Sequence, residues 1–149
     1  MKHDLSLKNP ADLYQKLLRE SKRVKSKVDS DNLFNFIVTA YHLTDWIGQS
    51  NKYSEVESEL KRLRDHDKYY YACRDIANAV KHFKITRYVP ETKEIISSSG
   101  YGKGRFGKGL YGVGEESIVI VLSDDSRLDL LDFVEQVVKM WKPIIDAVK

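Results

Sequence analysis

Apolar residues recur every three or four positions along much of the chain, and this spacing predicts amphipathic helices. The first expected helix covers 10–28, with Asn9 suited to cap its start and Pro10 to occupy its first position. One face of this helix is apolar and consists of Leu13, Leu17, Val24 and Val28. We therefore expect this face to pack against a second element.

Three further helices are expected before the pattern changes. Asp29 or Ser30 is suited to cap a helix over 30–48 that is apolar nearly all round, which is typical of the centre of a bundle. The segment "SEVE" fits a capping box, with Ser54 as cap, at the start of a charged helix over 54–64. A longer helix follows over 68–83, and the chain ends in an amphipathic helix over 129–147.

Strand-like composition separates these last two helices. β-branched residues dominate "SIVIVL", and turn residues lie on both sides of it. We expect a two- or three-stranded antiparallel meander over 84–128, with a glycine-rich loop over 99–114. The sequence thus predicts one domain, 1–149, of mainly α class: a bundle of four to five helices with a small antiparallel β-meander inserted before the C-terminal helix.

Composition agrees with a soluble globular domain, because 42% of residues are hydrophobic and 32% are charged. No apolar run approaches the roughly 18 residues of a membrane span, so no membrane partner is expected. The N-terminus lacks the apolar core of a secretory signal, and one cysteine, Cys73, cannot form an internal disulfide. These features favour a cytoplasmic protein.

The net charge of +3 is unevenly distributed along the chain. Residues 1–28 hold eight Lys/Arg against three acids, whereas residues 115–135 hold seven acids against one Arg. Four of the cations, Lys16, Arg19, Arg23 and Lys27, line up on one face of the first helix. Such polarity suits the steering of a polyanion, and it also suits two solvated helix faces of opposite sign.

Two expected helices carry polar residues on narrow stripes. At 100° per residue, Asp75 and His82 lie about 20° apart, with Tyr71 and Asn78 alongside. His42 and Asp45 lie on a stripe of the helix over 30–48. Since buried polar groups need partners, we expect the two stripes to approach each other.

The sequence leaves three interpretations of these stripes open. They form a structural network that fixes helix register, a His/carboxylate metal site, or an acid–base site. In the acid–base interpretation His82 transfers a proton, Asp75 or Asp45 orients it, and Arg74 or Lys81 holds a phosphate.

The segment "RDIANAVKH" resembles the motif of the HEPN (higher eukaryote and prokaryote nucleotide-binding) domains, in which an arginine followed by a polar residue precedes a histidine on a late helix. The resemblance covers about residues 10–83 and the last helix, and the spacer between Arg74 and His82 is longer than is usual in the family. It implies a metal-independent ribonuclease, or a toxin–antitoxin or phage-defence component, without a cofactor. His82, Asp75 and Arg74 would then be the catalytic residues, and a homodimer and an antitoxin-like protein partner are implied as well.

The glycine-rich loop holds seven of the eight glycines and a G-x-G-x-x-G pattern that does not open a helix, which excludes a dinucleotide fingerprint. Lys103, Arg105 and Lys108 alternate there with aromatic residues, a combination that suits single-stranded nucleic acid or a plain hairpin connection. Three functions therefore stand as hypotheses: a HEPN-like protein acting on RNA, a noncatalytic interaction module, and a metal-dependent bundle enzyme.

Overall fold

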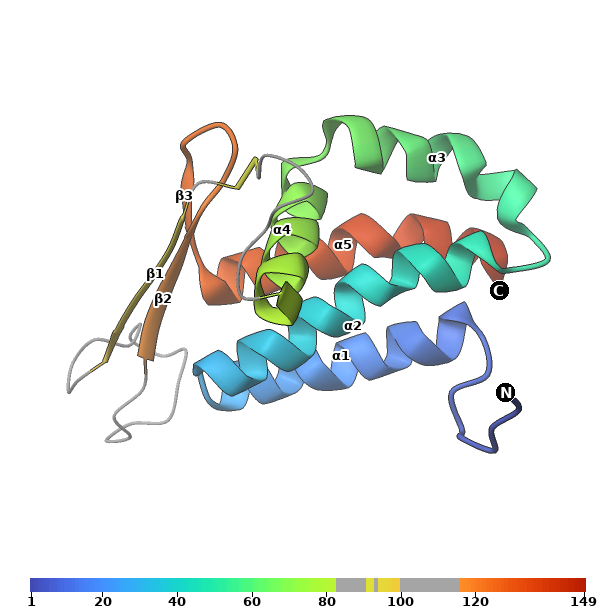
Figure 1. Ribbon diagram of the computed structural model, residues 1–149, viewed down its shortest axis with the longest axis horizontal. Coiled ribbons are helices and arrows are strands. Elements are labelled where there is room, and N and C mark those ends of the chain that lie inside the picture. The colour runs from blue at the N-terminus through green and yellow to red at the C-terminus, as the bar shows by residue number, and fades with distance from the viewer. Residues whose placement is uncertain (83–90, 93, 100–115) are drawn as a thin grey trace.

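The computed structural model describes residues 1–82, 91–92, 94–99 and 116–149, and these residues form five helices and three strands. The elements in chain order are α1 (Pro10–Ser26), α2 (Ser30–Gly48), α3 (Tyr53–His66), α4 (Lys68–His82), β1 (Glu94–Ser99), β2 (Glu116–Val121), β3 (Arg127–Asp129) and α5 (Leu130–Val148). The mainly helical bundle with a small antiparallel sheet before the last helix is confirmed (Figure 1). Residues 83–90, 93 and 100–115, which include most of the expected glycine-rich loop, lie outside the described residues.

Local capping signals explain where the first two helices begin. The side chain of Asn9 accepts the amide of Asp12 at 2.9 Å, and that of Asp29 accepts the amide of Asn32 at 2.8 Å. The capping box expected at Ser54 is wrong. Helix α3 begins one residue earlier, at Tyr53, and its N-cap residue makes no side-chain capping bond. A turn already holds this end, because the amide of Tyr53 donates to the carbonyl of Ser50 at 3.2 Å.

Helix α2 is central, since it contacts each of the other four helices. Its buried side includes Phe36, Ile37, Leu43 and Ile47, none of which is exposed to solvent. One side of α2 nevertheless faces solvent, because Phe34 is 45% exposed. The neighbouring helices cover only part of its circumference, and a stripe of larger side chains is left at the surface.

The sheet stands at one end of the bundle (Figure 1). Strand β2 lies between β1 and β3, and both pairings are antiparallel. The central strand packs into the common core and contacts α5. The core side chains on this part of the chain include those of Ile118, Ile120 and Leu122. The turn from β2 to β3 is closed by the amide of Leu122 donating to the carbonyl of Ser126 at 2.9 Å.

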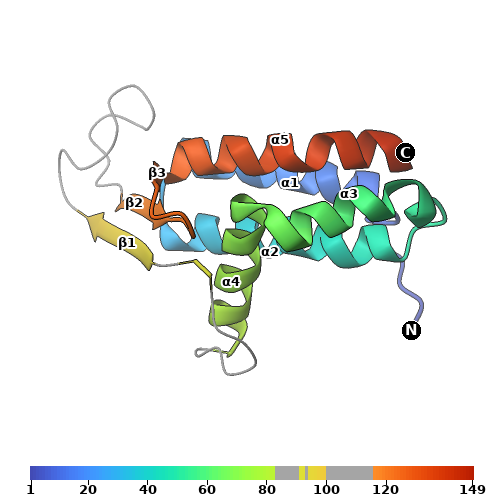
Figure 2. The ribbon, with the colours of Figure 1, turned by 90° about the horizontal axis from the view of Figure 1, so that it is seen from above.

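Helix α4 crosses the direction of α1, α2 and α5 (Figures 1 and 2). Asp67 accepts the amides of Tyr69 and Tyr70 at 2.9 and 3.0 Å and so caps its start. Its first half is buried, but Val80 is 45% exposed and Lys81 is exposed, so the helix leaves the core before it ends at His82. None of the described helices is long and apolar enough to cross a membrane.

Candidate functional site

Asp75 is the centre of a polar cluster on α4, which we call the α4 cluster: Tyr71, Arg74, Asp75, Asn78, Glu91 and Thr92. Asp75 is only 3% exposed. One carboxylate oxygen accepts the Nε–H of Arg74 at 2.9 Å, and the other accepts the backbone amides of Glu91 and Thr92 at 2.9 and 2.7 Å. Two successive amides that converge on one carboxylate tie the chain entering β1 to the middle of α4.

Arg74 is held on three sides within the α4 cluster. Besides Asp75, its guanidinium reaches a carboxylate oxygen of Glu91 at 3.4 Å, and it lies over the ring of Tyr71 at 5.1 Å from the centroid. Among the residues that the structure describes, one cation therefore faces two carboxylates here. A phosphate placed on Arg74 would compete with carboxylates that are already in place.

The remaining polar residues of this stripe have structural partners or point outward. The side-chain amide of Asn78 donates to the carbonyl of Arg74 at 2.8 Å, and the hydroxyl of Tyr71 donates to the carbonyl of Asp65. Lys81 is exposed at the protruding end of α4. The side chain of His82 lies outside what the structure describes, so its approach to Asp75 and its role in proton transfer stay predictions.

His42 and Asp45 lie in different surroundings from Asp75. Both are exposed on α2, so the premise that they are buried and need partners within the core is wrong. The side of α2 that meets α4 instead presents Thr44, whose hydroxyl lies 3.4 Å from the Tyr70 hydroxyl, and Tyr41, whose ring lies 6.2 Å from that of Tyr70. Burial raises the pKa of Tyr70, so this hydroxyl stays protonated near neutral pH.

Metal binding finds no support in the described part of the chain, which brings together no three His, Cys, Asp or Glu side chains in a position to hold an ion. Cys73 is fully buried, and burial raises the pKa of its thiol far above the ordinary value. A thiol in that state is a weak ligand and a weak nucleophile. The His42, His82, Asp45 and Asp75 metal site thus remains without an observation in its favour.

A second polar region lies on the outer side of α1, and we call it the α1 basic face: Lys16, Arg19, Lys22, Arg23 and Lys27. At 100° per residue the first four cations fall within less than half of the helix circumference, and Lys27 follows directly after the last helical residue, Ser26. Four of them are exposed and Lys16 is half-buried. Arg19 and Lys22 make no hydrogen bond or ion pair with any residue that the structure describes. The region thus holds positive charge that the fold leaves unmatched.

Glu20 organises the buried edge of the α1 basic face. Its carboxylate is buried, and one oxygen accepts Lys16 Nζ at 2.7 Å and Arg23 at 2.6 Å. Lys16 Nζ also reaches the Thr39 hydroxyl of α2 at 3.2 Å. The second oxygen of Glu20 is buried and has no partner among the described residues. Sequence reasoning missed Glu20, although it falls on the apolar stripe between Leu17 and Val24, where a charged residue is unexpected.

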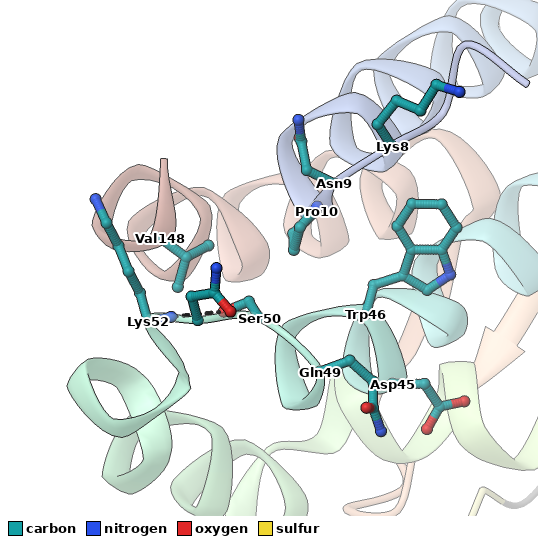
Figure 3. A pocket seen from close by; sticks show the side chains of 10 residues that line it. Lys8, Asn9, Pro10, Asp45, Trp46, Gln49, Ser50, Lys52 and Val148 are labelled. Carbon is teal, nitrogen blue, oxygen red and sulfur yellow. Dashed lines mark hydrogen bonds between the residues drawn. The ribbon is translucent and has the colours of Figure 1, made fainter. Parts of the chain in front are cut away.

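Next to the α1 basic face, α2 presents side chains spaced four apart, Phe34, Val38, His42 and Trp46, which we call the α2 aromatic ridge. A hollow of about 250 Å³ is lined by this ridge and by Lys16, Thr39 and residues of the N-terminal segment. A larger hollow of about 620 Å³ lies between the start of α1, the end of α2 and the end of α5 (Figure 3). Trp46 lines both hollows.

The larger hollow has an apolar interior and a polar rim. Pro10, Trp46 and Val148 face its interior from three different helices (Figure 3). Lys8 and Lys52 contribute positive charge at the rim, whereas the side chains of Asp45 and Gln49 turn away from the space between Trp46 and Pro10 (Figure 3). Its volume falls within the range of about 300–1,000 Å³ that is usual for ligand sites.

The nucleic-acid contacts expected at Lys103, Arg105 and Lys108 lie outside the described residues. Comparison of the whole chain with family models, with curated proteins and with solved structures finds no match. Function must therefore be argued from the two polar regions and from the hollows beside Trp46.

Proposed function

We propose that this protein binds RNA and that the α1 basic face is the surface on which it does so. The observation that carries the proposal is the unmatched charge of Arg19 and Lys22 within a set of four cations on one helix face, with Lys27 directly after the helix. Lysine and arginine side chains bind nucleic acid by neutralising phosphates and releasing condensed counterions. Cations that are not engaged by the protein's own carboxylates bring the most to such binding.

The α4 cluster is a poorer candidate for the phosphate contact. Its arginine already pairs with Asp75 and Glu91. Asp75 also accepts two backbone amides, which would lose this acceptor if the carboxylate moved to make room for a phosphate. We therefore interpret Arg74 and Asp75 as residues that hold α4 to the segment preceding β1, in line with the structural-network interpretation. The proposal assigns RNA contact to α1 instead of α4.

Substitution of two cations on each of two helices tests this assignment. The variant Arg19→Gln/Lys22→Gln removes unmatched cations, and Lys61→Gln/Arg62→Gln removes the same net charge from α3, which lies on the other side of the bundle (Figure 1). Binding of fluorescein-labelled RNA is followed by anisotropy over a series of salt concentrations. We expect the α1 variant to lose about tenfold in affinity and to flatten the salt slope by about 0.7 per cation. Equal losses in both variants, or no binding by the wild type, would refute the proposal.

The resemblance to HEPN domains adds a second candidate, cleavage of the bound RNA. The observation in its favour is that α4 leaves the core before its end, so that Lys81 is exposed next to His82. His82 would take the proton of the RNA 2′-hydroxyl while its oxygen bonds to the adjacent phosphorus. The bond from phosphorus to the 5′-oxygen of the next nucleotide breaks, that oxygen receives the proton, and a 2′,3′-cyclic phosphate is left without the need for a metal ion. We expect the wild type to cleave RNA in the presence of EDTA. The variant His82→Ala should not cleave RNA, and its melting temperature should equal that of the wild type. Intact RNA after incubation with the wild type would leave binding as the sole activity.

A further inference from the structure

Trp46 has an unusual position, because it is the side chain common to two hollows on the same side of the molecule. Phe34, about three turns away on the same ridge, is 45% exposed and lines the smaller hollow. Large aromatic side chains are normally buried, and these two are held at the surface by the packing of α2. An aromatic face left beside a hollow can accept another flat ring by stacking.

Cations accompany the aromatic residues in both hollows. Lys16, held in place by the buried Glu20, lines the smaller one. At the rim of the larger one lie Lys8, which pairs with the exposed Asp4 at 3.5 Å, and Lys52, whose Nζ donates to the carbonyl of Lys149. Asp45 is the acidic lining residue, and it turns away from the Trp46 ring (Figure 3). The smaller hollow also presents Asn35, Thr39 and His42, whose side chains can hydrogen-bond to the edge of a ring.

We propose that the RNA bound by this protein is single-stranded and that two of its bases occupy the hollows on either side of Trp46. This inference rests on the proposed function and specifies the form of RNA that is bound. Alternation of cations with aromatic side chains is the arrangement that binds single strands, since phosphates meet the cations while unpaired bases stack on the rings. The smaller hollow has the volume of roughly eight liquid water molecules, which is the scale of one base.

Duplex RNA does not fit this arrangement. Its bases are stacked on one another, and proteins contact it mainly through the phosphates and 2′-hydroxyls of the minor groove. Such a ligand would use the α1 basic face and leave both hollows unfilled. Single-stranded and duplex RNA should therefore depend in the same way on Arg19 and Lys22 and differ in their dependence on Trp46.

Two variants of Trp46 test the inference, each titrated with labelled oligouridine and with a labelled RNA duplex of equal length. Trp46→Leu keeps apolar bulk against the core and removes the aromatic face, and Trp46→Phe keeps an aromatic face. We expect Trp46→Leu to weaken oligouridine binding by about tenfold with an unchanged salt slope. Duplex binding should be unaffected by this variant, and Trp46→Phe should retain most of the affinity for oligouridine.

Tryptophan fluorescence gives a second readout that needs no variant. The other tryptophan, Trp141, is fully buried, so quenching by oligouridine reports stacking on Trp46. Oligouridine binding that quenches nothing, or that is unchanged in Trp46→Leu, would overturn the inference alone. Tighter binding of oligodeoxythymidine or of the duplex than of oligouridine would overturn single-stranded RNA as the occupant. A wild type that binds neither form of RNA would instead overturn the proposed function.

Discussion

Asp75 on α4 and Glu20 on α1 are buried to the same degree, with each residue 3% exposed, and each is paired with an arginine of its own helix. Their partners differ in kind. Asp75 accepts two backbone amides as well as Arg74, whereas the bonds of Glu20 come from the side chains of Lys16 and Arg23. One oxygen of Glu20 has no partner among the described residues.

This difference decides what each carboxylate does for the molecule. Backbone amides of a folded segment cannot turn to solvent when their acceptor is lost, so Asp75 fixes one part of the chain to another. The side chain of Arg23 is 56% exposed and can turn to water when its partner is removed. Equal burial therefore does not imply equal importance for stability. We expect the charged groups of the α4 cluster to keep their partners, whereas the cations of the α1 basic face can exchange Glu20 for water or a ligand.

The largest expected effect is that of Asp75→Ala. This substitution leaves Arg74 and two amides without their common acceptor, and removing one partner of a buried pair destabilises a protein by about 3–5 kcal/mol. For a chain of this size, we expect the melting temperature to fall by roughly 10 °C. Hydrogen exchange at the amides of Glu91 and Thr92 should become much faster than in the wild type.

Glu91→Gln is the matched control for that experiment, because it changes a carboxylate that also contacts Arg74 but whose side chain is 47% exposed. An exposed pair of this kind contributes less than about 1 kcal/mol. If Asp75→Ala melted within a degree or two of Glu91→Gln, the proposed difference between Asp75 and Glu20 in their importance for stability would be wrong.

The second effect is that of Glu20→Met. This substitution should change the stability of the protein only slightly and should strengthen RNA binding. A methionine fills a similar volume and removes a carboxylate oxygen that is buried without a partner among the described residues. The side chains of Lys16 and Arg23 are 32% and 56% exposed, so both cations can turn to water when Glu20 is lost. We expect the free energy of unfolding to change by less than about 1 kcal/mol in urea denaturation. Lys16 and Arg23 would lose their internal counterion, so RNA should bind more tightly and with a salt slope steeper by about 0.7 for each extra phosphate contact.

Weaker RNA binding by Glu20→Met would contradict this reasoning. It would mean that Glu20 positions Lys16 and Arg23 productively and does not merely compete for them. Glu20→Gln separates these cases, because it retains a hydrogen-bond acceptor while removing the charge.

The helices could be predicted because their signals are local. Asn9 and Asp29 cap the helices that they were expected to cap, and the apolar stripe of α1 is buried as its spacing indicates. The rotation of α2 about its axis could not be predicted in the same way. A helix with apolar residues nearly all round does not specify which side meets which neighbour, so His42 and Asp45 were expected in the core and lie at the surface.

The partners of Asp75 were beyond sequence reasoning for a different reason. Glu91 and Thr92 offer backbone amides, which every residue except proline possesses, so no side-chain pattern marks them. The sequence did indicate that Asp75 lies on a narrow polar stripe of its helix. It could not show that its acceptor capacity is taken up by a segment about sixteen residues further along the chain.

The smallest expected effect concerns a second tie between α4 and the sheet, at the surface. Lys68 at the start of α4 donates to Asp124 in the β2–β3 turn at 2.9 Å, and Asp124 also accepts the hydroxyl and the amide of Ser126. The Ser126 hydroxyl first, and then Lys68, lower the pKa of the Asp124 carboxyl. Because the folded state favours the ionised form of Asp124, its contribution to stability is present above the ordinary carboxyl pKa and is lost as the pH falls through the lowered value.

Asp124 is exposed, so solvent and salt weaken its interaction with Lys68. We expect Asp124→Asn to melt within about 2 °C of the wild type at neutral pH, with the difference vanishing in acid. A fall as large as that of Asp75→Ala would show that burial does not distinguish the two ties.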